Sequence, residues 1–303
     1  MRAALINSGL GLLGAAAALR RLRPGTDLVL AMDPDGMPWG PRRPDEIAAR
    51  SLACAEAAVA YRPDVLVFAC NTGSVHALGA LRERFEPALP VVGTVPAIKP
   101  AAAAGAPMAI WATAATTGSA YQHGLIAQFG AGVPVTEVAC PGLADAIHAG
   151  DGPATGAAVA DAAARTPPGT RSIVLGCTEY ELAADRIAAA LPGTVTFGSA
   201  AAVAAQALRR AAAACDGAPR ADGPEADGPR PDGPRADGPR ADGAGPEGAG
   251  PEGAGPGGAG AAPGQVHVLL SGRPGELPAA ALRYPEGRLL AGLPACGVSS
   301  PSS

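Results

Sequence analysis

Two stretches of the chain repeat one pattern of hydrophobic and polar positions. In each, a short apolar run ends at a cysteine that is followed by hydroxyl, amide or carboxyl side chains. The two copies are Val65–Thr72 and Ser172–Glu179. A continuous apolar run of this length predicts a buried parallel strand, and the polar residues after it predict the start of a helix.

The rest of the chain alternates short apolar runs with longer helical patterns. The expected strands are Arg2–Asn7, Thr26–Met32, Val65–Cys70 and Val91–Val95, then Met108–Thr113, Val135–Cys140, Ser172–Cys177 and Thr194–Gly198. The two cysteine strands lie 177 − 70 = 107 residues apart, and each is the third of its set of four. Strands that alternate with helices predict parallel sheets covered on both faces. The pattern therefore predicts a duplicated α/β fold, two similar parallel-sheet domains that face each other across a cleft.

The pattern also predicts how the chain is divided. Residues 1–97 form the first domain, joined by an Ala-rich helix over 199–215 and by a returning segment over 265–290, while residues 98–198 form the second. Residues 216–264 repeat Gly, Pro, Ala, Asp, Glu and Arg without large apolar side chains, which predicts a disordered linker. Residues 291–303 are expected to be a flexible tail. Asp45 is expected to cap the helix that follows it.

The repeated pattern places a thiol where chemistry is expected. Ligands of parallel α/β sheets bind beyond the carboxyl ends of the strands, so two facing domains bring Cys70 and Cys177 to one cleft. A helix N-terminus favours thiolate and can lower a thiol pKa to between about 3.5 and 7.5. Two thiols on opposite sides of a substrate can serve as base and acid. Asn71, Thr72 and Thr178 can bind a carboxylate beside them.

Composition and charge exclude several classes of protein. The net charge of −4 and a pI near 5.6 give no basic footprint for nucleic acid. No apolar run is long enough for a membrane span, and the N-terminus lacks a signal-peptide pattern, so a cytoplasmic protein is expected. The six cysteines show no disulfide framework or zinc spacing. Lys99, the only lysine, is followed by a proline and is a poor Schiff-base residue, so no pyridoxal cofactor is expected.

A second motif favours a different class of protein. Gly9, Gly11 and Gly14 fit the dinucleotide-binding pattern GxGxxG between a strand and a helix, and Asp33 ends the second strand. This alternative, a nicotinamide-dependent oxidoreductase, leaves the repeated cysteine pattern without a purpose. A tight turn that binds a small ligand is the favoured interpretation.

Several motifs together resemble a known family. They are Asn7–Gly9, Met37–Gly40, Ala69–Thr72, Val91–Pro100, Ala112–Thr113 with Thr116, and Gly176–Tyr180. In order and over about residues 1–215, the chain resembles the cofactor-independent glutamate racemases of the aspartate/glutamate racemase superfamily. The resemblance implies two flavodoxin-like domains, an acidic amino acid as substrate, no cofactor or metal, and a role in supplying D-glutamate for peptidoglycan. It leaves room for a homodimer.

The resemblance also implies the site residues. Cys70 and Cys177 would be the catalytic pair, one removing the α-proton and the other delivering a proton to the opposite face. The substrate-binding residues it implies are Asn7, Ser8, Pro38, Trp39, Gly40, Asn71, Thr72, Gly73, Thr113, Thr116, Thr178 and Glu179.

The chain departs from the family pattern at four of these positions or near them. Asn7 replaces an aspartate, Trp39 a tyrosine, Glu179 a histidine and His148 a glutamate. We hypothesise that Glu179 and His148 are an exchanged acid and imidazole pair that polarises Cys177, with Asn7 as a third assisting residue. Two alternatives stay open beside the oxidoreductase: a racemase of aspartate or hydantoin, and a binding protein without activity.

Overall fold

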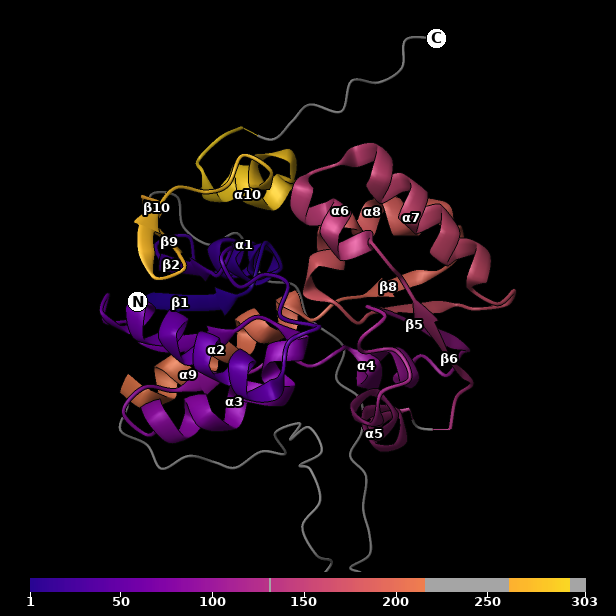
Figure 1. Ribbon diagram of the computed structural model, residues 1–303, viewed down its shortest axis with the longest axis horizontal. Coiled ribbons are helices and arrows are strands. Elements are labelled where there is room, and N and C mark those ends of the chain that lie inside the picture. The colour runs from indigo at the N-terminus through magenta and orange to yellow at the C-terminus, as the bar shows by residue number, and fades with distance from the viewer. Residues whose placement is uncertain (131, 216–261, 295–303) are drawn as a thin grey trace, which may run out of the picture.

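The protein, described here by a computed structural model, is built from two parallel sheets with helices on both faces (Figure 1). The structure describes residues 1–130, 132–215 and 262–294. The linker expected over 216–264 therefore lies outside the described residues except for 262–264, and the tail expected over 291–303 except for 291–294. The larger sheet has strand order β10-β9-β2-β1-β3-β4 and the smaller one β6-β5-β7-β8.

The first half of the chain and its last described segment supply the larger sheet. Its strands are β1 (Arg2–Asn7), β2 (Asp27–Met32), β3 (Val65–Phe68), β4 (Val91–Val92), β9 (Val266–Leu270) and β10 (Arg273–Gly275). The helices around it are α1 (Leu12–Leu22), α2 (Pro44–Val59), α3 (Asn71–Phe85), α9 (Ala200–Cys215), η2 (Ala281–Arg283) and α10 (Pro285–Leu290).

The middle of the chain supplies the smaller sheet. Its strands are β5 (Met108–Ala112), β6 (Val135–Ala139), β7 (Ser172–Leu175) and β8 (Val195–Phe197). The helices around it are α4 (Ile98–Ala103), α5 (Ala120–Phe129), α6 (Leu143–Ala149), α7 (Gly152–Arg165), η1 (Thr178–Ala183) and α8 (Ala184–Ala190). We call the two halves the first and second lobes.

The two lobes share one topology. The order β2-β1-β3-β4 in the first matches β6-β5-β7-β8 in the second, and these strands are parallel. A flavodoxin-like sheet has this order. The α/β fold expected from the sequence is confirmed, and both cysteine strands are central in their sheets, where continuous apolar runs belong.

Alternate residues of the central strands face two different cores. Leu5 and Leu30 face the side covered by α1 and α9, whereas Ile6 and Phe68 face α2 and α3. The core on the α1 side continues into the second lobe through Tyr180 of η1 and side chains of β5 and β7. The lobes are therefore held together by shared apolar packing as well as by the two chain crossings.

The C-terminal segment returns to the first lobe. Strand β9 pairs in parallel with β2, and α10 lies against α1 (Figure 1). The antiparallel strand β10 and the helix α10 were not expected from the sequence, because three and six residues give too little periodicity to detect. The domain boundaries drawn from the sequence stay a prediction.

Two local expectations were wrong. Asp45 does not cap α2: the N-cap is Arg43, Pro44 occupies the first turn, and Asp45 lies inside that turn. A proline at this position needs no N–H partner, which lets the helix begin two residues earlier than expected. After Cys177 the chain forms the 3-10 helix η1 before α8, rather than starting an α-helix directly.

Candidate active site

A cavity of about 330 Å³ lies between the two lobes, at the carboxyl ends of the parallel strands. Its lining residues from the first lobe are Ser8, Met37, Pro38, Trp39, Gly40, Pro41, Cys70, Asn71 and Thr72. Those from the second are Thr113, Ala114, Ala115, Thr116, Cys140, Pro141, Gly142, Ala144, Asp145, His148, Gly176, Cys177, Thr178 and Glu179. The volume suits a small ligand. Both cysteines of the repeated pattern line it.

Cys70 is the N-cap residue of α3. Its Sγ accepts a hydrogen bond from the backbone N–H of Gly73, at 3.3 Å. Burial, and after it the negative charge of Glu179, raises the pKa of the Cys70 thiol to about 12, and the N–H groups of the helix end only partly offset this. The lowered pKa expected from the helix dipole is therefore wrong, because removal of the thiol from water outweighs the dipole.

Cys177 is in contact with a carboxylate. Its Sγ lies 3.0 Å from Oε2 of Glu179 and donates to it. Burial, and then the charge and hydrogen bond of Glu179, raise the pKa of the Cys177 thiol well above its ordinary value. Oε2 also accepts from the Thr178 hydroxyl at 3.3 Å, and Oε1 from the Gly11 N–H at 3.2 Å. Glu179 is thus fixed against the thiol by donors from both lobes.

Hydrogen bonds join the two cysteine motifs across the cleft. Nδ2 of Asn71 donates to the carbonyl of Gly176 at 2.8 Å, so the residue after Cys70 is bonded to the residue before Cys177. Nδ2 of Asn7 donates to the Thr178 hydroxyl at 3.2 Å. These buried contacts fix the two thiols on facing walls of one cavity.

His148 reaches the cavity from α6. Its Nδ1 is buried and has no hydrogen-bond partner among the described residues. Burial lowers the pKa of the imidazole, against the charges of Glu179 and Asp145. His148 and Glu179 line the same cavity, but it is Glu179 that contacts the thiol. Thr113 and Thr116 also line the cavity, and their hydroxyls lie 3.1 Å apart.

Two of the expected substrate-binding residues do not line the cavity. Asn7 is fully buried behind it: Nδ2 donates to the carbonyl of Ala69 and to Thr178, and Oδ1 accepts from the Gly9 N–H at 2.9 Å. Gly73 lies one turn into α3, where its N–H faces Cys70. Asn7 therefore supports the cleft from behind, because its polar atoms are already used by the backbone and by Thr178.

The glycine-rich turn is a contact between the lobes. A Cβ at Gly11 would lie 2.3 Å from Oγ1 of Thr178 and 2.6 Å from Nδ2 of Asn7, so only glycine fits. The Gly11 N–H is already bonded to Glu179. The turn thus faces protein, where a dinucleotide loop presents its N–H groups to phosphate.

Several lining residues were missed in the sequence. They are Met37, Pro41, Ala114, Ala115, Cys140, Pro141, Gly142, Ala144 and Asp145. Strand β6 lies beside β5 and ends just before Cys140, so the rule that ligands bind at the carboxyl ends of parallel strands could have found this wall. The small and apolar residues carry no chemical signal of their own.

The described ranges contain neither a candidate metal site nor a helix suited to a bilayer. Within residues 1–130, 132–215 and 262–294, no group of three His, Cys, Asp or Glu side chains is placed to hold a metal ion. None of the helices described there has the length and apolar character needed to cross a bilayer.

The buried thiols predict a loss of stability at alkaline pH. Burial raises the pKa of Cys54, Cys70 and Cys140 to about 12 in the fold, against about 8.5 when unfolded. The folded state therefore keeps these protons to a higher pH than the unfolded state does. The free energy of unfolding falls as pH rises from about 9 towards 12. Each such thiol should lower the free energy of unfolding by about 1.4 kcal/mol per pH unit in that range.

Urea unfolding at several pH values measures this slope. Cys54→Ala removes one of the thiols at a site outside the cavity and should flatten the slope by that amount, although it also lowers stability at neutral pH. An identical slope in Cys54→Ala and the unaltered protein would contradict the prediction.

The comparisons with known proteins agree with this geometry. The family model of Asp/Glu/hydantoin racemases matches residues 12–207. A glutamate racemase of Roseiflexus sp. (strain RS-1) is 42% identical over 185 residues, which cover 59% of this chain and 67% of the relative. One of Pseudomonas putida (strain W619) is 35% identical over 215 residues, covering 69% and 81%.

A solved structure gives the same result. The crystal structure of Escherichia coli glutamate racemase in complex with L-glutamate and the activator UDP-MurNAc-Ala matches with a TM-score of 0.65 and 30% identity. The match covers 70% of this chain and 82% of that one. The chain belongs to the Asp/Glu/hydantoin racemase family and is an isomerase, as its paired cysteine motifs predict.

Proposed function

We propose that the protein interconverts L- and D-glutamate through a two-cysteine proton transfer at Cα. The observation that carries the proposal is the placement of Cys70 and Cys177 in one cavity, on lobes joined by the hydrogen bond from Asn71 to Gly176. Its glutamate racemase relatives support glutamate as the substrate. Because the chain belongs to an isomerase family, we prefer this function to that of a nicotinamide-dependent oxidoreductase.

Two thiols on different lobes suit a reaction that moves protons on both faces of Cα. The two enantiomers present the α-hydrogen on opposite faces, so inversion needs a proton acceptor on one side and a donor on the other. The thiolate of one cysteine takes the α-proton as the Cα–H bond breaks, and the thiol of the other gives its proton to the opposite face of Cα. No electron is gained or lost, and the thiol and thiolate have exchanged places.

Polar groups of both lobes would hold the substrate. Residues Ser8, Thr72, Thr113 and Thr116 line the cavity, and their hydroxyl groups can donate hydrogen bonds to a carboxylate. The same donors would stabilise the negative charge that develops as the α-proton leaves. Within the described residues the lining contains no lysine or arginine, so carboxylates would be held by hydrogen bonds rather than by ion pairs.

Because the thiol pKa values are raised, the charge of the bound substrate is expected to help form the thiolate. Burial of Cys70 and Cys177 opposes the ionised form of both thiols. The α-ammonium group of a bound amino acid would bring a positive charge beside the sulfur atoms and favour their ionised form. For Cys177, Glu179 Oε2 is the hydrogen-bonded acceptor that can take the thiol proton, which leaves the carboxyl neutral and the sulfur charged.

Solvent isotope incorporation tests the proposal. L-glutamate and D-glutamate are incubated separately with the protein in deuterated water, and deuterium at Cα is followed in both enantiomers. With two bases, deuterium enters the product enantiomer before it enters the remaining substrate. Turnover of aspartate or hydantoin alone would overturn the choice of substrate. Ligand binding with no exchange on any of the three would identify a binding protein.

The proposed cellular role is the supply of D-glutamate for peptidoglycan. Expression of the chain in a bacterium that requires D-glutamate for growth should remove that requirement. The Cys70→Ala variant, expressed at the same level, should not.

A further inference from the structure

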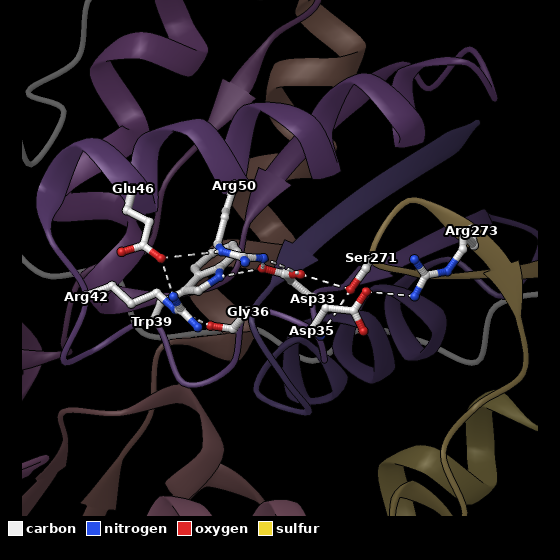
Figure 2. A network of polar contacts seen from close by, with 9 residues as sticks. All are labelled: Asp33, Asp35, Gly36, Trp39, Arg42, Glu46, Arg50, Ser271 and Arg273. Atoms are coloured by element: carbon white, nitrogen blue, oxygen red, sulfur yellow. Dashed lines mark hydrogen bonds and ion pairs between the residues drawn. The ribbon is translucent and has the colours of Figure 1, made fainter.

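A buried carboxylate next to the cavity accepts hydrogen bonds from three separate segments of the chain. Asp33 follows β2 and is 2% exposed. Its carboxylate accepts from Nε1 of Trp39 at 2.9 Å, from Nη1 of Arg50 at 3.1 Å and from the hydroxyl of Ser271 at 2.9 Å (Figure 2). We call these four residues the Asp33 network.

One member of the Asp33 network is a wall of the cavity. Trp39 lines the cavity, is 1% exposed, and packs on Phe68 with ring centroids 6.0 Å apart. The indole N–H is its only polar group, and Asp33 uses it. A buried indole is oriented by the partner of its N–H, so the carboxylate sets how the ring faces the cavity.

Another member comes from the far end of the chain. Ser271 follows β9 with φ +47° and lies 238 residues after Asp33 in sequence. Its hydroxyl donates to Oδ1 of Asp33 and accepts from the Asp35 N–H at 3.1 Å, while its own N–H donates to the carbonyl of Met32 at 2.7 Å. The returning segment therefore holds both the carboxylate and the loop that carries Trp39.

We propose that Ser271 is a positioning residue for the substrate cavity, acting through Asp33 on the ring of Trp39. It rests on the proposed glutamate racemisation only for the choice of substrate. Among the described residues, the hydrogen bonds of Cys70 and Cys177 go to groups outside the Asp33 network, so the effect falls on how well a substrate fits and leaves the proton transfers in place. The C-terminal segment is then a part of the active-site wall, in addition to extending the sheet.

The test compares three variants. Ser271→Gly removes the hydroxyl and keeps a backbone that glycine adopts at positive φ without strain. It should raise KM for glutamate about fivefold and change kcat less than twofold, and Ser271→Ala should agree with it. Arg273→Ala is the matched control, because Arg273 lies on the same hairpin and its side chain, within the described part of the chain, forms an exposed ion pair with Asp35 and no other. It should leave both constants unchanged.

Two further readouts separate positioning from general damage. In a Trp39→Phe background, which lacks the N–H, Ser271→Gly should raise KM no further. Acrylamide should quench tryptophan emission more strongly in Ser271→Gly than in the unaltered protein, and this increase should vanish when Trp39 is absent. Quenching needs no turnover, so it decides the proposal even if glutamate proves not to be the substrate.

Three results would overturn the proposal. They are unchanged KM and quenching in Ser271→Gly, an equal rise of KM in the Trp39→Phe background, and a loss of kcat as large as the rise of KM.

Discussion

The rate of glutamate racemisation should fall at least about a thousandfold when either Cys70 or Cys177 is replaced by alanine. A positioned acid or base accelerates a reaction about 10²-fold to 10⁴-fold, and each cysteine fills both roles in turn. Both thiols line the cavity on facing lobes, and alanine offers no group that can carry the proton. The rate is measured from the change of optical rotation or by chiral chromatography, starting from each enantiomer.

The control for this experiment is a cysteine outside the cavity. Cys54 is a buried residue of α2, and burial raises the pKa of its thiol as it does for Cys70. Cys54 does not line the cavity. Cys54→Ala should retain activity within a few fold. Substantial racemisation by Cys70→Ala or by Cys177→Ala would show that the proton is carried by another group, and the two-cysteine mechanism would be wrong.

Replacing Glu179 by glutamine should slow the direction in which Cys177 acts as the base, by about a hundredfold in kcat. Oε2 of Glu179 lies 3.0 Å from Sγ of Cys177. Glutamine keeps the size of the side chain but cannot take up the thiol proton. The opposite direction, in which Cys177 starts as a thiol, should lose much less. His148→Ala should give a smaller imbalance of kcat, since His148 lines the cavity without contacting the sulfur.

Thermodynamics sets how this experiment is interpreted. The two enantiomers have equal free energies in water, so kcat/KM must stay equal in the two directions, and KM must shift with kcat.

Glu181→Gln is the matched control: Glu181 lies in the same 3-10 helix, but its carboxylate accepts from Ser199 and Ala200 at the start of α9. It should change stability and leave the two kcat values balanced. Equal losses in both directions for Glu179→Gln would assign Glu179 a purely structural role.

The sheets could be predicted from the sequence because their strands are buried on both faces. Val65–Phe68 and Ile173–Leu175 are uninterrupted apolar runs, and each lies between polar or turn residues that mark its ends. The cavity followed from the same rule, since the residues after such strands meet at one edge of each sheet. Cys70, Cys177, Asn71 and Thr178 were located in this way.

The remaining features depend on contacts that no local pattern records. The direction of the Cys70 pKa shift comes from burial between two lobes, which the helix position alone does not reveal. Asn7 is the last residue of the first strand, a place where a pocket residue is expected, yet its amide is used by Ala69 and Thr178 behind the wall. Ser271 reaches Asp33 across 238 residues of sequence, and a lone serine after a strand carries no signal.

The short strands at both margins of the larger sheet limit how it can associate with other chains. An unpaired sheet margin is a template on which a further strand can add. One margin here is β10, three residues long with Pro274 at its centre, and the other is β4, with two residues. Proline cannot donate to a neighbouring strand, and two residues offer too few groups to hold one. A sheet rich in valine and leucine is thereby protected from edge-to-edge aggregation, and a homodimer is not expected to form by strand pairing at these two margins.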